Sequence, residues 1–301
     1  MKDWMQQIWK RIGLAIVCGV LISAGQGLAG QEDPGESLAD KRLVEILSAE
    51  REMIRASMEG VGQEGILVRA QDIARSYESF LAENPNHLYG WILCGKFLRS
   101  VGADADAFAA LRKADSLQPN LPVVQQQIGL VFMDQGAFEA ALPYLLRAVE
   151  LDPNEPEFHN DLGLFLVQFG SELEDDGVLG QGRASALALE SFQNAFRLDP
   201  ENFERGWRWA EAHADLPHPD WEATALAWES ILPLASTPIE VEASRLQISR
   251  AWIEAGQADR AVQWMAPVET VALQPSWRQL QDRLNGGRDD DPASSGAEGL
   301  E

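Results

Sequence analysis

Cysteine, histidine and tyrosine are rare in this 301-residue chain, with two, four and three residues respectively. Cys18 lies in an apolar run near the N-terminus, and Cys94 is the other cysteine. If that run is removed, an intramolecular disulfide is excluded and the core alone must stabilise the fold. The sequence also has no Asn-x-Ser/Thr acceptor for an N-linked glycan. Both absences favour a bacterial periplasm over a eukaryotic secretory route.

Basic side chains are also scarce, since 24 Lys and Arg face 47 Asp and Glu, which gives a formal charge of -23. A charge of this sign repels phosphate backbones and anionic lipid surfaces. We therefore expect no nucleic-acid partner. Solubility and long-range attraction of basic partners are the consequences that we do expect.

Familiar catalytic motifs are absent as well. The sequence contains no Gly-x-Ser-x-Gly elbow, no His-Glu-x-x-His pair, no phosphate-binding loop and no Cys-x-x-Cys. Cys94 falls on a packing position of the repeat described below, where a thiol acts as a small apolar side chain. We predict that the chain is not an enzyme and carries no cofactor.

Two groups of residues leave metal binding open as an alternative. His213, Asp215, His218 and Asp220 are of the types that bind zinc, but their spacing matches no established zinc motif. A second, acidic group suits calcium by its oxygen ligands but lacks the alternating spacing of a calcium loop. It comprises Glu172, Glu174, Asp175 and Asp176. A core histidine followed by a turn, and a solvated loop, are the structural interpretations that we favour, so we assign no metal site.

The first 29 residues have the order of a secretory signal peptide. Lys2, Lys10 and Arg11 form a basic start, residues 12–24 are uncharged and mostly apolar, and Gly27 and Ala29 have the spacing that a signal peptidase accepts. A bilayer span needs about 20 apolar residues, which is more than this run supplies. We predict export to the periplasm or the medium of a bacterium, with no integral membrane span after cleavage. An uncleaved N-terminal anchor is the alternative.

The rest of the chain has helical periodicity and repeats itself every 34 residues. The first clear copy has Trp91, Cys94, Gly95, Leu98, Gly102, Ala107, Leu111, Ala114 and Pro119. The second has Gln125, Ile128, Gly129, Phe132, Gly136, Ala141, Leu145, Ala148 and Pro153. The third has His159, Leu162, Gly163, Leu166 and Gly170, then Ala188, Phe192, Ala195 and Pro200.

This spacing resembles that of the tetratricopeptide repeat family, whose pattern is Trp-x2-Leu-Gly-x2-Tyr, then Ala-x3-Phe, then Pro. The resemblance implies an all-α, right-handed superhelical solenoid of stacked helical hairpins. It predicts one elongated repeat domain over residues 37–285, with clear units 88–121, 122–155 and 156–202. Degenerate units would cover 37–87, 203–241 and 242–274. A capping helix at 275–285 and a disordered acidic tail at 286–301 would follow.

Small residues in the repeat mark close approaches and helix ends. Gly95, Gly129 and Gly163 are expected where one helix meets its partner. Four further glycines are expected to end helices in a left-handed conformation: Gly102, Gly136, Gly170 and Gly256. Pro119, Pro153 and Pro200 should follow the second helix of each unit. Thirteen extra residues at 171–183 are expected to form a surface loop.

The family uses the first helix of each hairpin to line a concave groove. By that resemblance, the predicted groove residues are Tyr89, Lys96, Arg99, Gln126, Leu130, Met133, Asn160, Leu164, Trp207, Glu211 and Arg250. Such a mixed surface suits an extended or helical protein segment. Some members clamp a terminal carboxylate with a lysine and an asparagine, but the matching positions here do not hold that pair.

The function that we predict is a non-catalytic scaffold or adaptor of the cell envelope, which binds a protein or peptide partner in this groove. Trp207 is expected on the groove face, where an exposed aromatic ring could hold a side chain or stack on a sugar. A glycan or peptidoglycan binder is therefore one alternative. A metal-dependent enzyme that uses the His213 to Asp220 group is the other.

Overall fold

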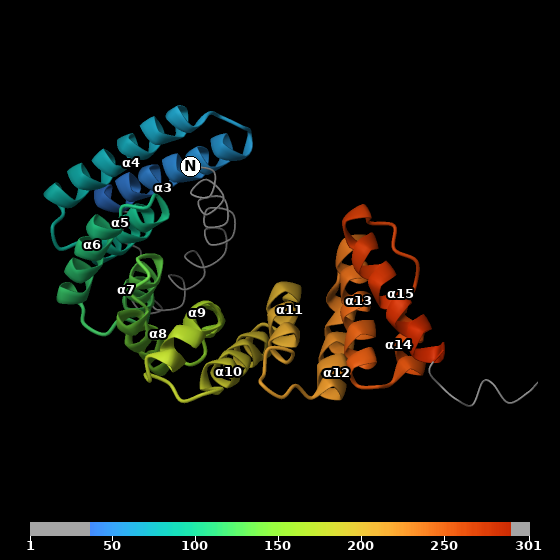
Figure 1. Cartoon of the computed structure of the whole chain (residues 1–301). Coiled ribbons are helices and arrows are strands. Elements are labelled where there is room, and N and C mark those ends of the chain that lie inside the picture. Colours follow the sequence, from blue (N-terminus) through green and yellow to red (C-terminus); the bar gives the residue numbers. More distant parts are fainter. Residues whose placement is uncertain (1–36, 290–301) are drawn as a thin grey trace, which may run out of the picture. The chain divides into compact units, whose positions relative to one another are not determined.

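The computed structural model describes residues 37–289, and all of its elements are helical (Figure 1). The predicted signal peptide (1–29) and most of the predicted acidic tail lie outside these residues. The helices are α3 (Leu38–Met58), α4 (Gln63–Glu83), α5 (Leu88–Ser100), α6 (Asp104–Leu117), α7 (Pro122–Asp134), α8 (Phe138–Leu151), α9 (Pro156–Asp175), α10 (Arg183–Leu198), α11 (Phe203–Ala212), α12 (Trp221–Ile231), α13 (Pro238–Glu254), α14 (Ala258–Trp264) and α15 (Gln274–Asp289), with short 3-10 turns at Leu232–Leu234 and Val271–Leu273.

The chain forms two compact units, with the division between Leu151 and Asp152. Within the described residues, unit 1 contains α3 to α8 and unit 2 contains α9 to α15. Sequence analysis predicted a single repeat domain over 37–285 and did not find this division. In a repeat stack each hairpin packs mainly on its neighbours, so a sequence period does not reveal where one compact unit ends.

The apolar positions of the repeat form the cores, as expected. In unit 1, Ala107, Leu111, Val124 and Ile128 are fully buried in one cluster that joins α5, α6 and α7. In unit 2, a second cluster around Trp228, Ile231, Ile248 and Trp252 joins α11 to α15. The prolines of the repeat also lie where predicted, because α6, α8 and α10 each end two residues before Pro119, Pro153 and Pro200.

Gly129 shows why the hairpins need a small residue in the first helix. A Cβ atom on this glycine would lie 2.9 Å from both Cγ and Cδ2 of Leu145 on α8. Gly95 and Gly163 meet Leu111 and Phe192 in the same way. The contact that requires glycine is therefore with the large apolar residue of the second helix.

The predicted end of a helix at Gly170 is wrong. Gly170 is buried inside α9, where an added Cβ would lie 2.5 Å from Ala184 Cβ. The helix continues to Asp175 because one more turn places Leu173 in a fully buried position in the core. Gly177 takes the left-handed conformation instead, with φ +73°. The surface loop predicted at 171–183 is thus shorter and spans residues 176–182.

Glu174, which the sequence placed in the acidic loop, lies in the last turn of α9 and has a structural role. Its carboxylate accepts hydrogen bonds from the backbone N of Gly182 (2.9 Å) and of Ala184 (2.8 Å), at the start of α10. These bonds lower the pKa of Glu174. The carboxylate therefore satisfies amide groups that the first turn of a helix leaves without partners.

The helices near the C-terminus begin and end at residues other than the predicted unit boundaries. α13 begins at Pro238, four residues before the predicted start of the last degenerate unit at 242. A capping box explains this start, since Thr237 Oγ accepts from the Glu240 amide and the Glu240 carboxylate accepts from the Thr237 amide. α15 covers the predicted capping helix at 275–285 and extends to Asp289.

A partly buried carboxyl group lies between α3 and α4, the two helices that begin unit 1. Glu50 on α3 accepts a 2.6 Å hydrogen bond from the hydroxyl of Tyr77 on α4, a side chain that is fully buried. Burial raises the pKa of Glu50 to about 7, although the Tyr77 hydrogen bond and the cations Lys96 and Arg51 oppose the rise. Compared with the unfolded chain, the folded state therefore favours the protonated form of the Glu50 carboxyl group.

We expect Gly129→Leu to lower the free energy of unfolding by about 1–3 kcal/mol, because the new side chain overpacks the contact with Leu145. Gly180→Leu is the matched control, since nothing lies within 4 Å of the position of its Cβ. Urea denaturation of both variants tests this. Equal denaturation midpoints for Gly129→Leu and the wild type would refute this packing.

We expect Glu50 to make stability depend on pH. Its contribution is fully present below its ordinary pKa of 4.5 and is lost as the pH rises through about 7. Glu50→Gln stays neutral and keeps an acceptor for Tyr77. The stability of the wild type relative to this variant should thus fall by roughly 3 kcal/mol between pH 4.5 and pH 8. Urea denaturation at each pH measures the difference, with Glu52→Gln as an exposed control on α3. A constant difference between wild type and Glu50→Gln would contradict the shift.

Candidate protein-interaction surface

The predicted groove residues are divided between the two units, and each set lies on the first helices of its hairpins. Those of unit 1 lie on α5 and α7: Tyr89, Lys96, Arg99, Gln126, Leu130 and Met133. Tyr89 is 65% exposed, Gln126 is buried, and the other four are half-buried. Arg99 pairs with Asp134 of α7 at 3.2 Å, which ties neighbouring first helices together.

In unit 2, the predicted residues lie on α9, α11 and α13. Asn160 of α9 is buried and Leu164, one turn later, is half-buried. Trp207 of α11 is half-buried, while Glu211 of α11 and Arg250 of α13 are exposed. The structure brings Asn160 together with α11, as described below, whereas Arg250 lies on a helix two elements further along.

Trp207 is partly a packing residue. Its ring meets that of Trp228 edge-on, with centroids 4.5 Å apart, and lies 5.8 Å from the ring of Phe203. These contacts fix the orientation of the indole and cover part of its surface. Trp207 is therefore half-buried, with part of its ring surface left accessible.

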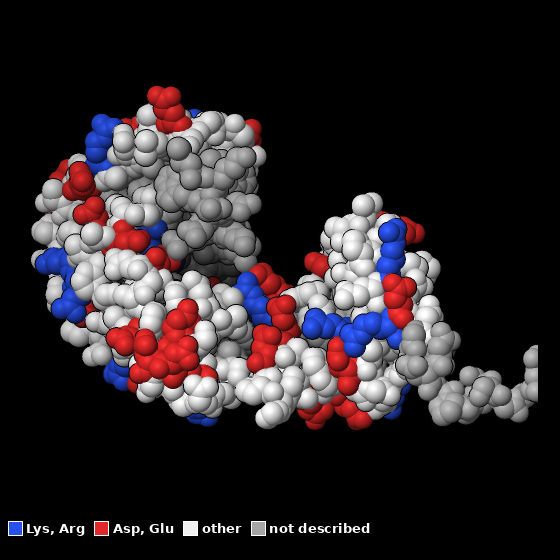
Figure 2. All heavy atoms as spheres, viewed as in Figure 1, with Lys and Arg blue, Asp and Glu red and all other residues white. Residues whose placement is uncertain are grey.

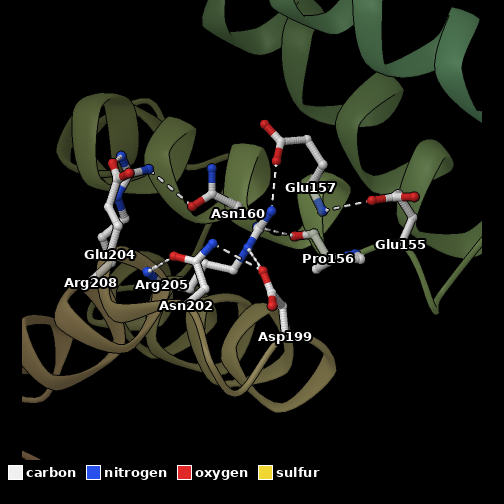
Figure 3. A network of polar contacts seen from close by, with 9 residues as sticks. All are labelled: Glu155, Pro156, Glu157, Asn160, Asp199, Asn202, Glu204, Arg205 and Arg208. Carbon is white, nitrogen blue, oxygen red and sulfur yellow. Dashed lines mark hydrogen bonds and ion pairs between the residues drawn. The ribbon is translucent and has the colours of Figure 1, made fainter. Parts of the chain in front are cut away.

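A network of polar contacts joins α9 to α11 around Arg205 (Figure 3). Arg205 Nη2 lies 2.9 Å from the carboxylate of Glu157, and its Nε lies 3.0 Å from Asp199. Its Nη1 also donates to the backbone oxygen of Pro156 at 3.1 Å. Since the Arg205 side chain is only 15% exposed, these charge-assisted bonds hold the two first helices in register.

Arg208 extends this network to Asn160. Its Nη1 donates to Asn160 Oδ1 at 3.0 Å, and its Nη2 forms an ion pair with Glu204 one turn earlier on α11 (Figure 3). Sequence analysis identified Asn160 but missed Arg205 and Arg208. The i, i+4 spacing of Glu204 and Arg208 was the available signal, yet that pattern is common on exposed helix faces.

The carboxyl group of Glu211, near Trp207, has a raised pKa. Glu211 is exposed as a residue, but partial burial of its carboxyl group is the main cause that raises its pKa, and the nearby Asp215 carboxylate adds to the effect. Arg208 and a hydrogen bond from Trp207 oppose the rise. The face that contains α11 thus combines restrained polar groups, an indole edge and carboxylates. Acidic side chains also cover more of the visible surface than basic ones do (Figure 2).

The His213 to Asp220 group has local roles. His213 ends α11, and its ring packs edge-on against Trp209 with centroids 5.4 Å apart. Burial lowers the pKa of His213, and the Asp220 carboxylate opposes this. Asp220 accepts from the Ala223 amide at 3.0 Å and caps α12. Within residues 37–289, no three His, Cys, Asp or Glu side chains form a group that could hold a metal ion.

Cys94 is one of the residues that line an open groove of about 630 Å³ between α4, α5 and α6 of unit 1. Alanine side chains line much of its walls, including Ala74, Ala109 and Ala110. Burial and surrounding carboxylates raise the pKa of Cys94 to about 12. The thiol is therefore protonated at neutral pH and is a poor nucleophile. Over the same described range, no helix is both long enough and apolar enough to span a bilayer.

The comparisons with known proteins agree with this architecture. A family model described as TPR repeat matches residues 129–170. The Photosystem I assembly protein Ycf3 of Acaryochloris marina is 23% identical over 142 residues, which cover 47% of this chain and 78% of Ycf3.

Two solved structures share the fold. PilF of Pseudomonas aeruginosa aligns with a TM-score of 0.54 and 15% identity, over 80% of this chain and 99% of that one. YrrB, a TPR protein with an unusual peptide-binding site, aligns with a TM-score of 0.52 and 14% identity, over 72% and 99%.

Three observations thus coincide: the 34-residue spacing, the stacked helical hairpins and the matches to proteins built in the same way. Proteins of this architecture generally act as scaffolds for other proteins and not as catalysts. Residues 129–170 thus match a tetratricopeptide repeat, and the described helices share the fold of solved tetratricopeptide repeat structures.

Proposed function

We propose that this chain is a non-catalytic scaffold of the cell envelope, and that it binds a partner protein through the first helices of its hairpins. The observation that carries the proposal is the face formed by α9 and α11. Polar side chains there are held by interhelical bonds beside the apolar Leu164 and Trp207. Groups held in place before binding lose little conformational entropy when a partner arrives, which favours recognition.

The N-terminal sequence supports a location of the protein in the cell envelope. Its basic start, apolar run and small residues before position 30 are typical of export signals. The peptide-binding site of YrrB supports a protein segment as the bound partner. The glycan alternative has less support, because Trp207 is engaged with Trp228.

We expect a photo-crosslinking amino acid at Leu164 to capture a partner protein in envelope extracts. Leu164 is half-buried on α9, next to the polar network, so a bound segment lies within reach of its side chain. The same amino acid at Glu190, which is exposed on the second helix α10, is the matched control. Mass spectrometry of the adducts should find a partner at Leu164 only. The same adducts at both positions, or none at Leu164, would reject this face as the binding surface.

We also expect the chain to be exported and cleaved when it is expressed in a bacterium. Fractionation followed by intact-mass measurement should find a periplasmic protein that has lost the first 29 residues. A full-length protein held in the inner membrane would support the uncleaved anchor. A full-length protein in the cytosol would contradict the envelope assignment.

A further inference from the structure

The open groove between α4, α5 and α6 exists because this part of the repeat holds small side chains. The repeat pattern has Leu and Tyr three and seven residues after its Trp, whereas here Cys94 and Leu98 follow Trp91. All three side chains line the groove of about 630 Å³, and α4 and α6 line it in large part with alanines. In a close-packed core such a space is filled by neighbouring side chains. The groove is therefore a position of the repeat that is left unfilled.

The next repeat shows which side chains fill this position. Three of the lining residues have aromatic counterparts 34 residues later: Ala74 corresponds to Phe108, Leu98 to Phe132 and Ala110 to Tyr144. These three rings pack together, with centroids 5.3 Å apart for Phe108 and Phe132 and 5.6 Å apart for Phe132 and Tyr144. They join α6, α7 and α8. The groove between α4, α5 and α6 is the equivalent site without this ring cluster.

The groove faces away from the predicted first-helix surface. Trp91, Cys94 and Leu98 are spaced by three and four residues, so they share one face of α5. Lys96, which belongs to the predicted first-helix surface, is two residues from both Cys94 and Leu98. Two residues correspond to about 200° around a helix, which puts Lys96 on the opposite face. A partner bound in this groove would leave the first-helix surface accessible.

The charges of the lining residues favour a basic partner. Glu78 of α4 and Asp106 of α6 line the groove, whereas their counterparts one repeat later are Arg112 and Ala140. Lys113 is the basic residue in the lining. Within residues 37–289, no ion pair engages Glu78, Asp106 or Lys113. Two carboxylates against one ammonium group attract Lys or Arg of a partner.

We propose that the groove between α4, α5 and α6 binds a partner protein through an aromatic side chain, which occupies the space of the missing ring cluster, and through a Lys or Arg beside it in the partner. Aromatic side chains bury a large area and are common anchors of protein interfaces. The indole of Trp91 offers the ring a fixed surface, since its Nε1 donates to the backbone oxygen of Pro85 at 2.9 Å. The inference goes beyond the proposed function, because it assigns a second surface that the first helices do not form alone.

The first experiment selects 12-residue peptides from a displayed random library with the purified chain and with a filled variant. The filled variant carries Ala74→Phe, Leu98→Phe and Ala110→Tyr, which recreate the ring cluster of the next repeat. We expect the wild type to enrich peptides in which an aromatic residue stands beside Lys or Arg, and the filled variant not to enrich them. The same peptides enriched by both proteins would place binding elsewhere, overturn the inference and leave the proposed function standing. Failure of the wild type to enrich such peptides would also overturn the inference.

The second experiment measures the affinity of a selected synthetic peptide. The filled variant, or Ala in place of the aromatic residue of the peptide, should weaken binding at least about 10-fold. Glu78→Gln and Asp106→Asn should each weaken it about 3-fold, and added salt should reduce this difference. Ala105→Phe is the matched control, since Ala105 is exposed on α6 and does not line the groove. Unchanged affinity of the filled variant, or an equal loss in Ala105→Phe, would overturn the inference.

Two measurements on the chain alone complete the test. Urea denaturation shows whether the filled variant folds, and its midpoint should not lie below that of the wild type, because its rings can pack as they do one repeat later. If the filled variant unfolds, Ala74→Phe at a half-buried position replaces it, with the same expected loss of affinity. Light scattering tests the other occupant. Self-association that rises with concentration and that the filled variant lacks would identify a second copy of the chain in the groove and overturn the inference.

Discussion

The close contact between the two helices of the α5/α6, α7/α8 and α9/α10 hairpins determines much of this structure. Gly129 brings α7 so near to α8 that Leu145 occupies the space of a missing side chain. The same contact recurs between Gly95 and Leu111 and between Gly163 and Phe192. A hairpin closed in this way still has an uncovered apolar surface, so it must stack on its neighbours. Stacking in turn places successive first helices side by side, and these helices carry the candidate surface.

That surface has a different chemistry from the core. Core contacts are apolar and recur from one helical hairpin to the next. The contacts between α9 and α11 are polar and occur at specific residues. Arg205 and Arg208 reach back from α11 to Glu157 and Asn160. Because both cations are neutralised, the network holds helices together without creating a strongly charged site. The network thus fixes the orientation of its hydrogen-bonding groups.

The described part of the chain is stabilised without disulfides. With Cys94 buried and its thiol protonated, disulfides contribute nothing among the described residues. Stability comes from the apolar clusters and from side chains that cap helices. Glu174 and Glu240 are examples, since each binds backbone amides at the start of a helix. Acidic side chains thus serve the fold at helix N-termini as well as solubility.

The sequence by itself determined the helical hairpins, the glycine contacts, the prolines after second helices and the helices on which the candidate surface lies. These features follow from spacings within one repeat, which local sequence encodes completely. Only the tertiary structure decided the length of α9 beyond Gly170, the division after Leu151 and the bond between Asn160 and Arg208. Leu173 extends α9 because it finds a buried site, and a pattern that expected a glycine end could not foresee that. Asn160 and Arg208 are 48 residues apart, and they meet only because neighbouring repeats stack.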